Sequence, residues 1–160
     1  MADAIAAAAE GGAALVELRL DHLVEAPDWS VLRASGRLPL LATCRRPRDG
    51  GLFAGEERER LDLLAAAMAA GVDWIDVEED VCATLPAAGI ARRVVSHHVL
   101  DDTPADLDPR VAGMRRLGAH VVKIVTRANR LVDNLTLLRQ CAAGPVPTIA
   151  FCMGARGLPS

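Results

Sequence analysis

The chain contains a single lysine, Lys123, which lies inside the apolar run His-Val-Val-Lys-Ile-Val-Thr. Its other strongly basic residues are 17 arginines, whose guanidinium groups stay protonated and are poor nucleophiles. A lysine in low-dielectric surroundings loses its proton more easily, and the neutral amine can attack a carbonyl group to form a Schiff base. The pattern therefore predicts a Schiff-base lysine. The alternative is a lysine that extends its charged end to the surface.

Two adjacent histidines, His97 and His98, follow a short apolar run. Neighbouring residues of a strand point to opposite faces, so only one of the two can share a face with a reactive lysine. Schiff-base chemistry needs a group that transfers protons near neutral pH, which histidine can do. One histidine is therefore a candidate general acid and base. The alternative is a structural role; a metal site is not indicated, because no further ligands stand at suitable spacing.

Charged residues recur at alternate positions of two other apolar segments. Glu17, Arg19 and Asp21 would share one face of a strand, and so would Asp76 and Glu78. Charges inside an apolar strand are costly unless they are paired. The pattern therefore predicts either a substrate-binding surface or a structural layer of ion pairs, and the residue types leave both open.

These residues lie on segments with apolar cores that are predicted to be strands. The segments are Leu15–Asp21, Leu38–Arg45, Trp74–Asp80, Arg92–Val99, His120–Thr126 and Pro147–Met153. Continuous apolar cores are typical of parallel strands covered on both faces. Helices are predicted over Ala2–Ala9, Glu56–Ala70, Pro104–Leu117 and Ala128–Ala143. The polar residues collect at the same end of successive strands, where parallel barrels build their active sites.

The alternation of helices and strands indicates an α/β protein built from βα units. A complete (β/α)8 TIM barrel begins with a strand and needs about 250 residues, whereas this sequence has 160 and opens with a helical segment. We therefore expect a single partial barrel domain over residues 1–160, with about six parallel strands and the first and eighth strands missing. The alternative is a doubly wound α/β domain, although no glycine-rich nucleotide-binding loop supports that version.

The composition of the chain indicates which partners and which cellular compartment to expect. The sequence is 51% hydrophobic with a net charge of −3, so nothing indicates nucleic acid or an anionic membrane as a partner. The four cysteines lack metal-binding or redox spacing, which favours a reducing compartment without disulfides. The N-terminus carries no signal-peptide pattern, and no apolar run is long enough to span a membrane. We expect a cytoplasmic protein.

Five motifs, in this order, resemble those of type I 3-dehydroquinate dehydratase. They are Glu17-Leu18-Arg19-Leu20-Asp21, Thr43-Cys44-Arg45 with Asp49-Gly50-Gly51, Val95-Ser96-His97-His98, Val122-Lys123-Ile124, and Met153-Gly154-Ala155-Arg156-Gly157-Leu158-Pro159-Ser160. They span nearly the whole chain. The segments Asp102-Thr103-Pro104 and Arg156-Gly157-Leu158 are similar to the form that is fused to shikimate dehydrogenase in plants.

The resemblance implies a (β/α)8 barrel lyase that dehydrates 3-dehydroquinate to 3-dehydroshikimate in the shikimate pathway of aromatic amino-acid biosynthesis. It implies that Lys123 forms the Schiff base and that His98, the second of the pair, is the general acid and base. It also implies a homodimer that needs no metal or other cofactor, with a small-molecule substrate and no nucleic-acid or membrane partner.

The same resemblance assigns the substrate-binding residues. Glu17, Arg19 and Arg45 match substrate-binding positions of the family. Asp49 stands where the family usually has glutamate before Gly-Gly, so its carboxylate reaches less far. Met153, at the end of the last predicted strand, is a further candidate for substrate binding.

The family's arginine for the substrate carboxylate follows the position of Ser160, the last residue of this sequence. The 160 residues alone are therefore not expected to be a competent dehydratase. Two alternatives remain open. Another Schiff-base barrel, such as a class I aldolase, would share Lys123 but has no use for the Glu17, Arg19 and Arg45 pattern. An inactive fragment of the dehydratase is the non-catalytic alternative.

Overall fold

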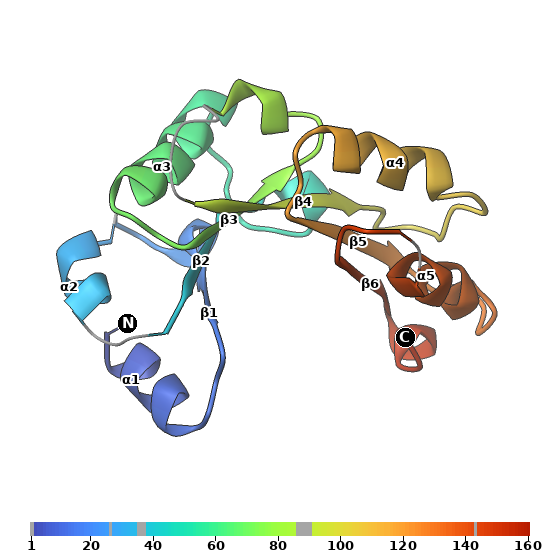
Figure 1. Ribbon diagram of the computed structural model, residues 1–160, viewed down its shortest axis with the longest axis horizontal. Coiled ribbons are helices and arrows are strands. Elements are labelled where there is room, and N and C mark those ends of the chain that lie inside the picture. Colours follow the sequence, from blue (N-terminus) through green and yellow to red (C-terminus); the bar gives the residue numbers. More distant parts are fainter. Residues whose placement is uncertain (1, 26, 35–37, 86–90, 143) are drawn as a thin grey trace. The chain divides into compact units, whose positions relative to one another are not determined.

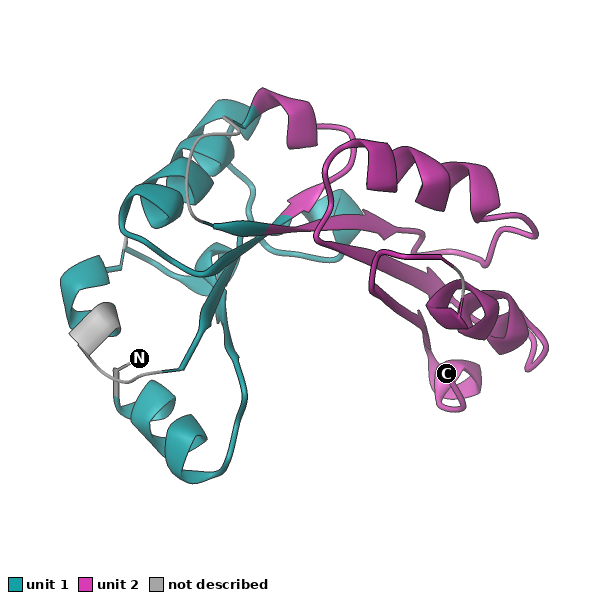
Figure 2. Cartoon of the chain, in the orientation of Figure 1, with its two compact units in different colours: residues 1–76, 85–92 teal, residues 77–84, 93–160 magenta. Residues whose placement is uncertain are grey.

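The computed structural model describes residues 2–25, 27–34, 38–85, 91–142 and 144–160. The chain divides into two compact units, which Figure 2 colours separately: residues 1–76 with 85–92, and residues 77–84 with 93–160. Helices and strands alternate along the chain in both (Figure 1). No helix among the described residues has both the length and the apolar character needed to cross a membrane.

The first unit is built on parallel strands that follow one another in chain order. Its elements are α1 (Ala2–Glu10), β1 (Val16–Arg19), a 3-10 turn (Leu20–His22), α2 (Trp29–Ala34), β2 (Leu40–Thr43), a 3-10 turn (Pro47–Asp49), α3 (Glu57–Ala69) and the first residues of β3 (Trp74–Glu78). Strand β1 pairs with β2, and β2 pairs with β3. Thr43 lies between Arg19 and Asp76 in this register.

The second unit repeats the same arrangement. It contains the end of β3, a 3-10 turn (Cys82–Thr84), β4 (Arg92–His98) except its first residue, α4 (Asp108–Arg116), β5 (Val121–Arg127), α5 (Asp133–Ala142), β6 (Thr148–Met153) and a 3-10 turn (Ala155–Gly157). Strand β5 pairs in parallel with β4 on one side and β6 on the other. Lys123 of β5 is level with Ser96 of β4 and Ile149 of β6.

All six predicted strands are confirmed, with ends that differ by at most two residues. Neighbours in each unit's sheet are also neighbours in the chain, whereas the strand order of a doubly wound sheet reverses at a switch point. The α/β class and the parallel, sequential strands expected of a barrel are therefore confirmed. The single domain expected over residues 1–160 stays a prediction.

Two predicted helices begin later than expected. The helix predicted from Pro104 begins at Asp108, because Pro109 fits the first helical turn but would break a helix interior. The helix predicted from Ala128 begins at Asp133, whose carboxylate accepts the backbone N–H groups of Asn129 and Arg130 and so holds the preceding turn. The expected end of that helix, residue 143, lies outside the described residues.

Helix α2 was not predicted from the sequence. Asp28 precedes it, and its carboxylate accepts the backbone N–H groups of Ser30 and Val31. This arrangement is that of an N-cap, which satisfies N–H groups that have no partner within the helix. The Asp-Trp-Ser sequence was the available signal, but the helix has only six residues and too short a periodic pattern to detect.

Arg60 of α3 links this helix to the end of β2 through a hydrogen bond. Its side chain is completely buried, and its Nη1 donates to the carbonyl oxygen of Cys44 at 2.6 Å. Its Nε and Nη2 donate to the two carboxylate oxygens of Glu57 at 3.0 and 2.8 Å. A buried cation is stable only when it is paired and hydrogen-bonded in this way.

Replacing Arg60 with methionine is expected to lower the free energy of unfolding by about 2–4 kcal/mol, because buried polar groups lose their donor. Urea unfolding measures the change. Arg58→Met is the matched control on the same helix: its side chain is 93% exposed, and an effect within about 0.5 kcal/mol is expected. Equal losses in the two variants would show that the Arg60 network contributes nothing specific.

Candidate active site

Lys123 projects from the middle of β5, onto a face that it shares with one of the two histidines. Residues level with one another on parallel strands project to the same face, as do alternate residues along a strand. Ser96 is level with Lys123, and His98 is level with Val125. These four side chains therefore share one face of the second unit, which we call the lysine face.

The other histidine points toward α4. His97 Nδ1 lies 2.9 Å from Glu79 Oε1, and Arg110 of α4 also bonds to Glu79. Burial by itself would raise the pKa of Glu79, but the hydrogen bond and charge of His97, together with Arg110, lower that pKa below its ordinary value. Because His97 faces α4, His98 is the histidine on the lysine face.

His98 and Lys123 lie on neighbouring strands of the lysine face. His98 is on β4, next to the strand of Lys123, and is offset from Lys123 by two residues toward the carboxyl ends of the strands. At ordinary strand spacings, the Cα atoms of His98 and Lys123 are therefore about 8 Å apart. Both side chains are half-buried. An amine and an imidazole on one half-buried face form the pair that Schiff-base chemistry requires.

Glu78 also lies on the lysine face. The backbone N–H of Glu79 donates to the carbonyl of Ser96 at 3.0 Å, which places Glu78 level with Ser96. The Glu78 side chain is almost completely buried. The sequence pattern drew attention to Glu78 but assigned no partner to it, because its position relative to Lys123 depends on strand register.

The polar residues of the first unit form a network on one face of β1, β2 and β3. Thr43 Oγ1 donates to Glu17 Oε1 at 2.7 Å. Arg45 Nη2 lies 2.6 Å from Asp76 Oδ2, and the two side chains are only 4% and 0% exposed. Asp76 therefore forms a buried ion pair with the candidate substrate-binding residue Arg45, whereas Glu17 is hydrogen-bonded to a hydroxyl group.

Asp21 joins the end of β1 to the loop that follows β2. Its two carboxylate oxygens accept from Nε and Nη2 of Arg19 at 2.9 and 2.7 Å, and Oδ2 also accepts from the backbone N–H of Leu52. Burial alone would raise the pKa of Asp21. The hydrogen bonds from Arg19, Leu52 and the backbone of Arg45, with the charge of Arg19, lower it instead to about 2.

This pKa predicts how stability depends on pH. A carboxyl whose pKa falls to about 2 on folding, from about 3.9 in the unfolded chain, contributes stability above pH 4 that is lost between about pH 4 and 2. We expect Asp21→Asn to destabilise the protein at pH 6, and the gap to the wild type to shrink as the pH falls toward 2. Urea unfolding at several pH values measures the gap, and a constant gap would contradict this role.

Comparison with known proteins identifies the family. A family model described as type I 3-dehydroquinase matches residues 1–160. The chain belongs to the type I 3-dehydroquinase family. It is 40% identical over 165 residues to a 3-dehydroquinate dehydratase of Syntrophobacter fumaroxidans, covering 91% of this chain and 69% of that protein.

Two further relatives widen the comparison. The chain is 38% identical to the chloroplastic bifunctional 3-dehydroquinate dehydratase/shikimate dehydrogenase of Arabidopsis thaliana, covering 94% of this chain but only 27% of that protein. The solved structure of 3-dehydroquinate dehydratase from Enterococcus faecalis matches with a TM-score of 0.82 at 26% identity, covering 99% of this chain and 77% of that one. The predicted family is confirmed, and relatives include a form fused to shikimate dehydrogenase.

In this type I 3-dehydroquinase chain, Asp49 makes local ion pairs. Its Oδ2 lies 2.6 Å from Arg46 Nε and 3.8 Å from Arg48 Nε. Gly51 is required in the same loop, because a Cβ there would lie 2.1 Å from the carbonyl oxygen of Arg45. The loop is thus fixed against the end of β2. Contact between Asp49 and a substrate stays a prediction.

Met153 lies at the start of a tight turn that folds back on β6. Gly154 has a φ of 84°, and a Cβ on Gly157 would lie 2.1 Å from the carbonyl oxygen of Cys152. Ser160 Oγ accepts from the backbone N–H of Cys152 at 2.8 Å and donates to the carbonyl of Gly157 at 2.9 Å. The turn therefore holds Met153 in place, level with Arg127 of β5.

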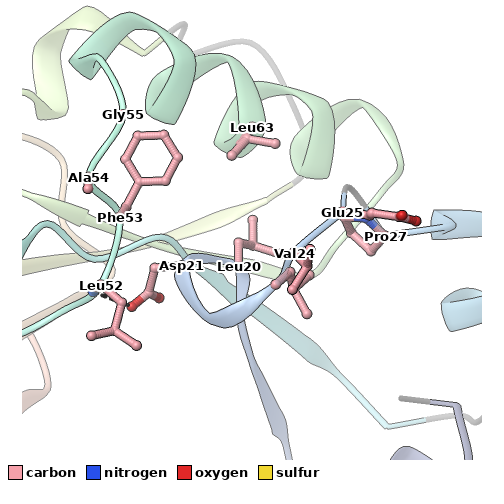
Figure 3. A pocket seen from close by; sticks show the side chains of 11 residues that line it. Leu20, Asp21, Val24, Glu25, Pro27, Leu52, Phe53, Ala54, Gly55 and Leu63 are labelled. Atoms are coloured by element: carbon pink, nitrogen blue, oxygen red, sulfur yellow. Dashed lines mark hydrogen bonds between the residues drawn. The ribbon is translucent and has the colours of Figure 1, made fainter.

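The first unit also contains a cavity of about 320 Å³ between the segments that follow β1 and β2 and helix α3 (Figure 3). Its lining includes Leu20, Phe53 and Leu63, and both oxygens of Asp21, which also lines it, are already bonded. Apart from Asp21, none of the residues singled out from the sequence lines it. Among the described residues, no group of three or more His, Cys, Asp or Glu side chains could hold a metal ion.

Proposed function

We propose that this protein dehydrates 3-dehydroquinate to 3-dehydroshikimate through a Schiff base on Lys123, as a step of the shikimate pathway. The observation that supports this most strongly is the lysine face, which presents the chain's only lysine and His98 together. Membership of the type I 3-dehydroquinase family is the basis for proposing 3-dehydroquinate as the substrate.

The covalent step begins with the neutral amine of Lys123. It attacks the C3 ketone of the substrate, and loss of one water gives an iminium ion. The iminium withdraws electrons from C2, so the C2 proton becomes acidic. Loss of that proton and of the C1 hydroxyl, which leaves as a second water, forms the conjugated double bond. Hydrolysis consumes one water and releases the enone product and the free lysine, so the net change is the loss of one water.

His98 is proposed to move the protons. It donates and accepts protons while the carbinolamine forms and collapses, then removes the C2 proton and assists departure of the C1 hydroxyl. The position of His98 beside Lys123 supports this role. No metal or nucleotide is needed in this scheme, because the iminium itself accepts the electrons.

Substrate binding is proposed for Glu17, Arg19 and Arg45, with Asp49 and Met153 as further candidates, because these residues match the family's motifs. The bidentate pair of Arg19 with Asp21 and the buried pair of Arg45 with Asp76 hold both guanidinium groups in fixed orientations. Fixed donors lose less conformational entropy when they bind a ligand. The proposal includes a cytoplasmic homodimer, which follows from the family resemblance.

Direct assay of the purified full-length protein, rather than of the 160 residues alone, tests this function. We expect 3-dehydroquinate to be converted into a product with the ultraviolet absorbance of a conjugated enone. A parallel screen of aldol substrates separates the dehydratase from an aldolase that shares Lys123. Cleavage of an aldol substrate without dehydration of 3-dehydroquinate would overturn the proposal.

A further inference from the structure

Glu78 is a buried acid on the lysine face that has no role in the proposed steps. It is level with Ser96 of β4, because the N–H of the next residue donates to the carbonyl of Ser96, and Ser96 is level with Lys123 of β5. Glu78, Ser96 and Lys123 therefore form one row across three neighbouring strands of the second unit. The middle residue of the row is small and uncharged, and the residues on either side of it are an acid and a base.

The row is short enough for the carboxylate of Glu78 and the amine of Lys123 to meet above Ser96. Two strand spacings separate the Cα atoms of Glu78 and Lys123 by about 10 Å, and extended glutamate and lysine side chains together span that distance. Ser96 is completely buried, although its neighbours His98 and Lys123 on the same face are only half-buried. Longer side chains that close over the serine from both sides account for its burial.

The surroundings of Glu78 favour a cation near its carboxylate. The Glu78 side chain is only 2% exposed, and an ionised carboxylate is costly to bury unless it is paired with a positive charge. Within its row of the second unit, Lys123 is the residue that supplies a positive charge. When Lys123 forms a Schiff base, the same nitrogen atom becomes part of an iminium cation, so the charge stays in place.

We propose that the carboxylate of Glu78 is the counter-ion of the Schiff base on Lys123 and stabilises the iminium cation relative to the neutral carbinolamine. This inference rests on the proposed function. Glu78 stays ionised throughout and transfers no proton, so His98 keeps that role. A fixed charge beside a charge that develops during the reaction contributes strongly to catalysis, because the protein does not have to reorganise when the new charge forms.

Glu78→Gln in the full-length protein tests the counter-ion, because it removes the charge and keeps the shape of the side chain. With 3-dehydroquinate, kcat is expected to fall by about 10²-fold while KM changes much less. Borohydride reduces the iminium but not the carbinolamine, so the fraction of enzyme trapped as an adduct on Lys123 at saturating substrate should also fall. The product, 3-dehydroshikimate, should show the same lower trapped fraction, because its Schiff base is a cation as well.

Two further variants separate the charge of Glu78 from its packing. Glu78→Asp should restore part of the trapped fraction, because it keeps the charge on a shorter side chain. Glu79→Gln is the matched control, since Glu79 is the next residue but bonds to His97 and Arg110 on the other side of the sheet. Its trapped fraction should equal that of the wild type. Thermal unfolding shows whether each variant is folded, and Glu78→Met takes the place of Glu78→Gln if the latter is unfolded.

The trapped fraction decides between this role and others. If a folded Glu78→Gln variant keeps the wild-type trapped fraction, the counter-ion assignment is overturned even where kcat falls, because the carboxylate then acts on another step. An equal loss of trapped adduct in Glu79→Gln would overturn it too, since the effect would not depend on the lysine face. If the wild type neither dehydrates 3-dehydroquinate nor forms an adduct, the proposed function itself fails, so the two failures are distinguishable.

Discussion

Replacing Lys123 with arginine is expected to lower kcat for dehydration of 3-dehydroquinate by about 10⁴-fold or more, as removal of a covalent nucleophile does in other enzymes. The positive charge is kept, but a guanidinium cannot serve as this nucleophile. Steady-state assay of enone formation measures the loss. Because Lys123 is half-buried among strand residues, the bulk of arginine is a concern for folding.

Lys123→Met addresses that concern, since methionine is a flexible apolar side chain that fills irregular space. Both variants should lose activity equally, and thermal unfolding shows whether each is folded. If a folded variant kept kcat within about tenfold of the wild type, the loss would be too small for a covalent nucleophile. The Schiff-base proposal would then be wrong, whatever the family's motifs imply.

The two histidines should differ strongly in their effect on activity. We expect His98→Ala to slow turnover by roughly 10²–10⁴-fold, which is the usual contribution of a general acid and base. His97→Ala should cost much less activity, because His97 pairs with Glu79 on the side of α4. Its loss should appear instead as reduced stability against urea.

Measuring kcat/KM across pH for both variants separates chemistry from folding. The wild type should show a pH dependence with a limb that disappears in His98→Ala and persists in His97→Ala. Equal losses of activity in the two folded variants, or a larger loss at position 97, would mean that His98 is not the proton-transfer residue.

The strands were predictable because their apolar cores are local features of the sequence. Six runs such as His120–Thr126 can be recognised as strands from their own apolar residues. Because neighbouring residues of a strand point to opposite faces, the sequence also predicted that His97 and His98 point in opposite directions. Helix starts were less predictable. The start of α4 depends on one proline, Pro109, and α2 depends on the cap at Asp28.

Partners between distant segments could not be read from the sequence. The donor for the Cys44 carbonyl is Arg60, sixteen residues away on another element, and the acid beside Arg45 is Asp76. The positions of Glu78 and Arg127 depend on strand register, which places Glu78 level with Ser96 and Arg127 level with Met153.

Trapping the covalent intermediate is the most direct test of the central claim. The protein is mixed with 3-dehydroquinate, reduced with borohydride and digested, and mass spectrometry locates the adduct. The chain's single lysine makes the assignment simple, because the N-terminal amine is the only other aliphatic amine in the sequence. We predict a reduced substrate adduct on Lys123 that is absent without substrate and absent from Lys123→Arg. An adduct confined to the N-terminal amine, with Lys123 unmodified, would contradict the mechanism.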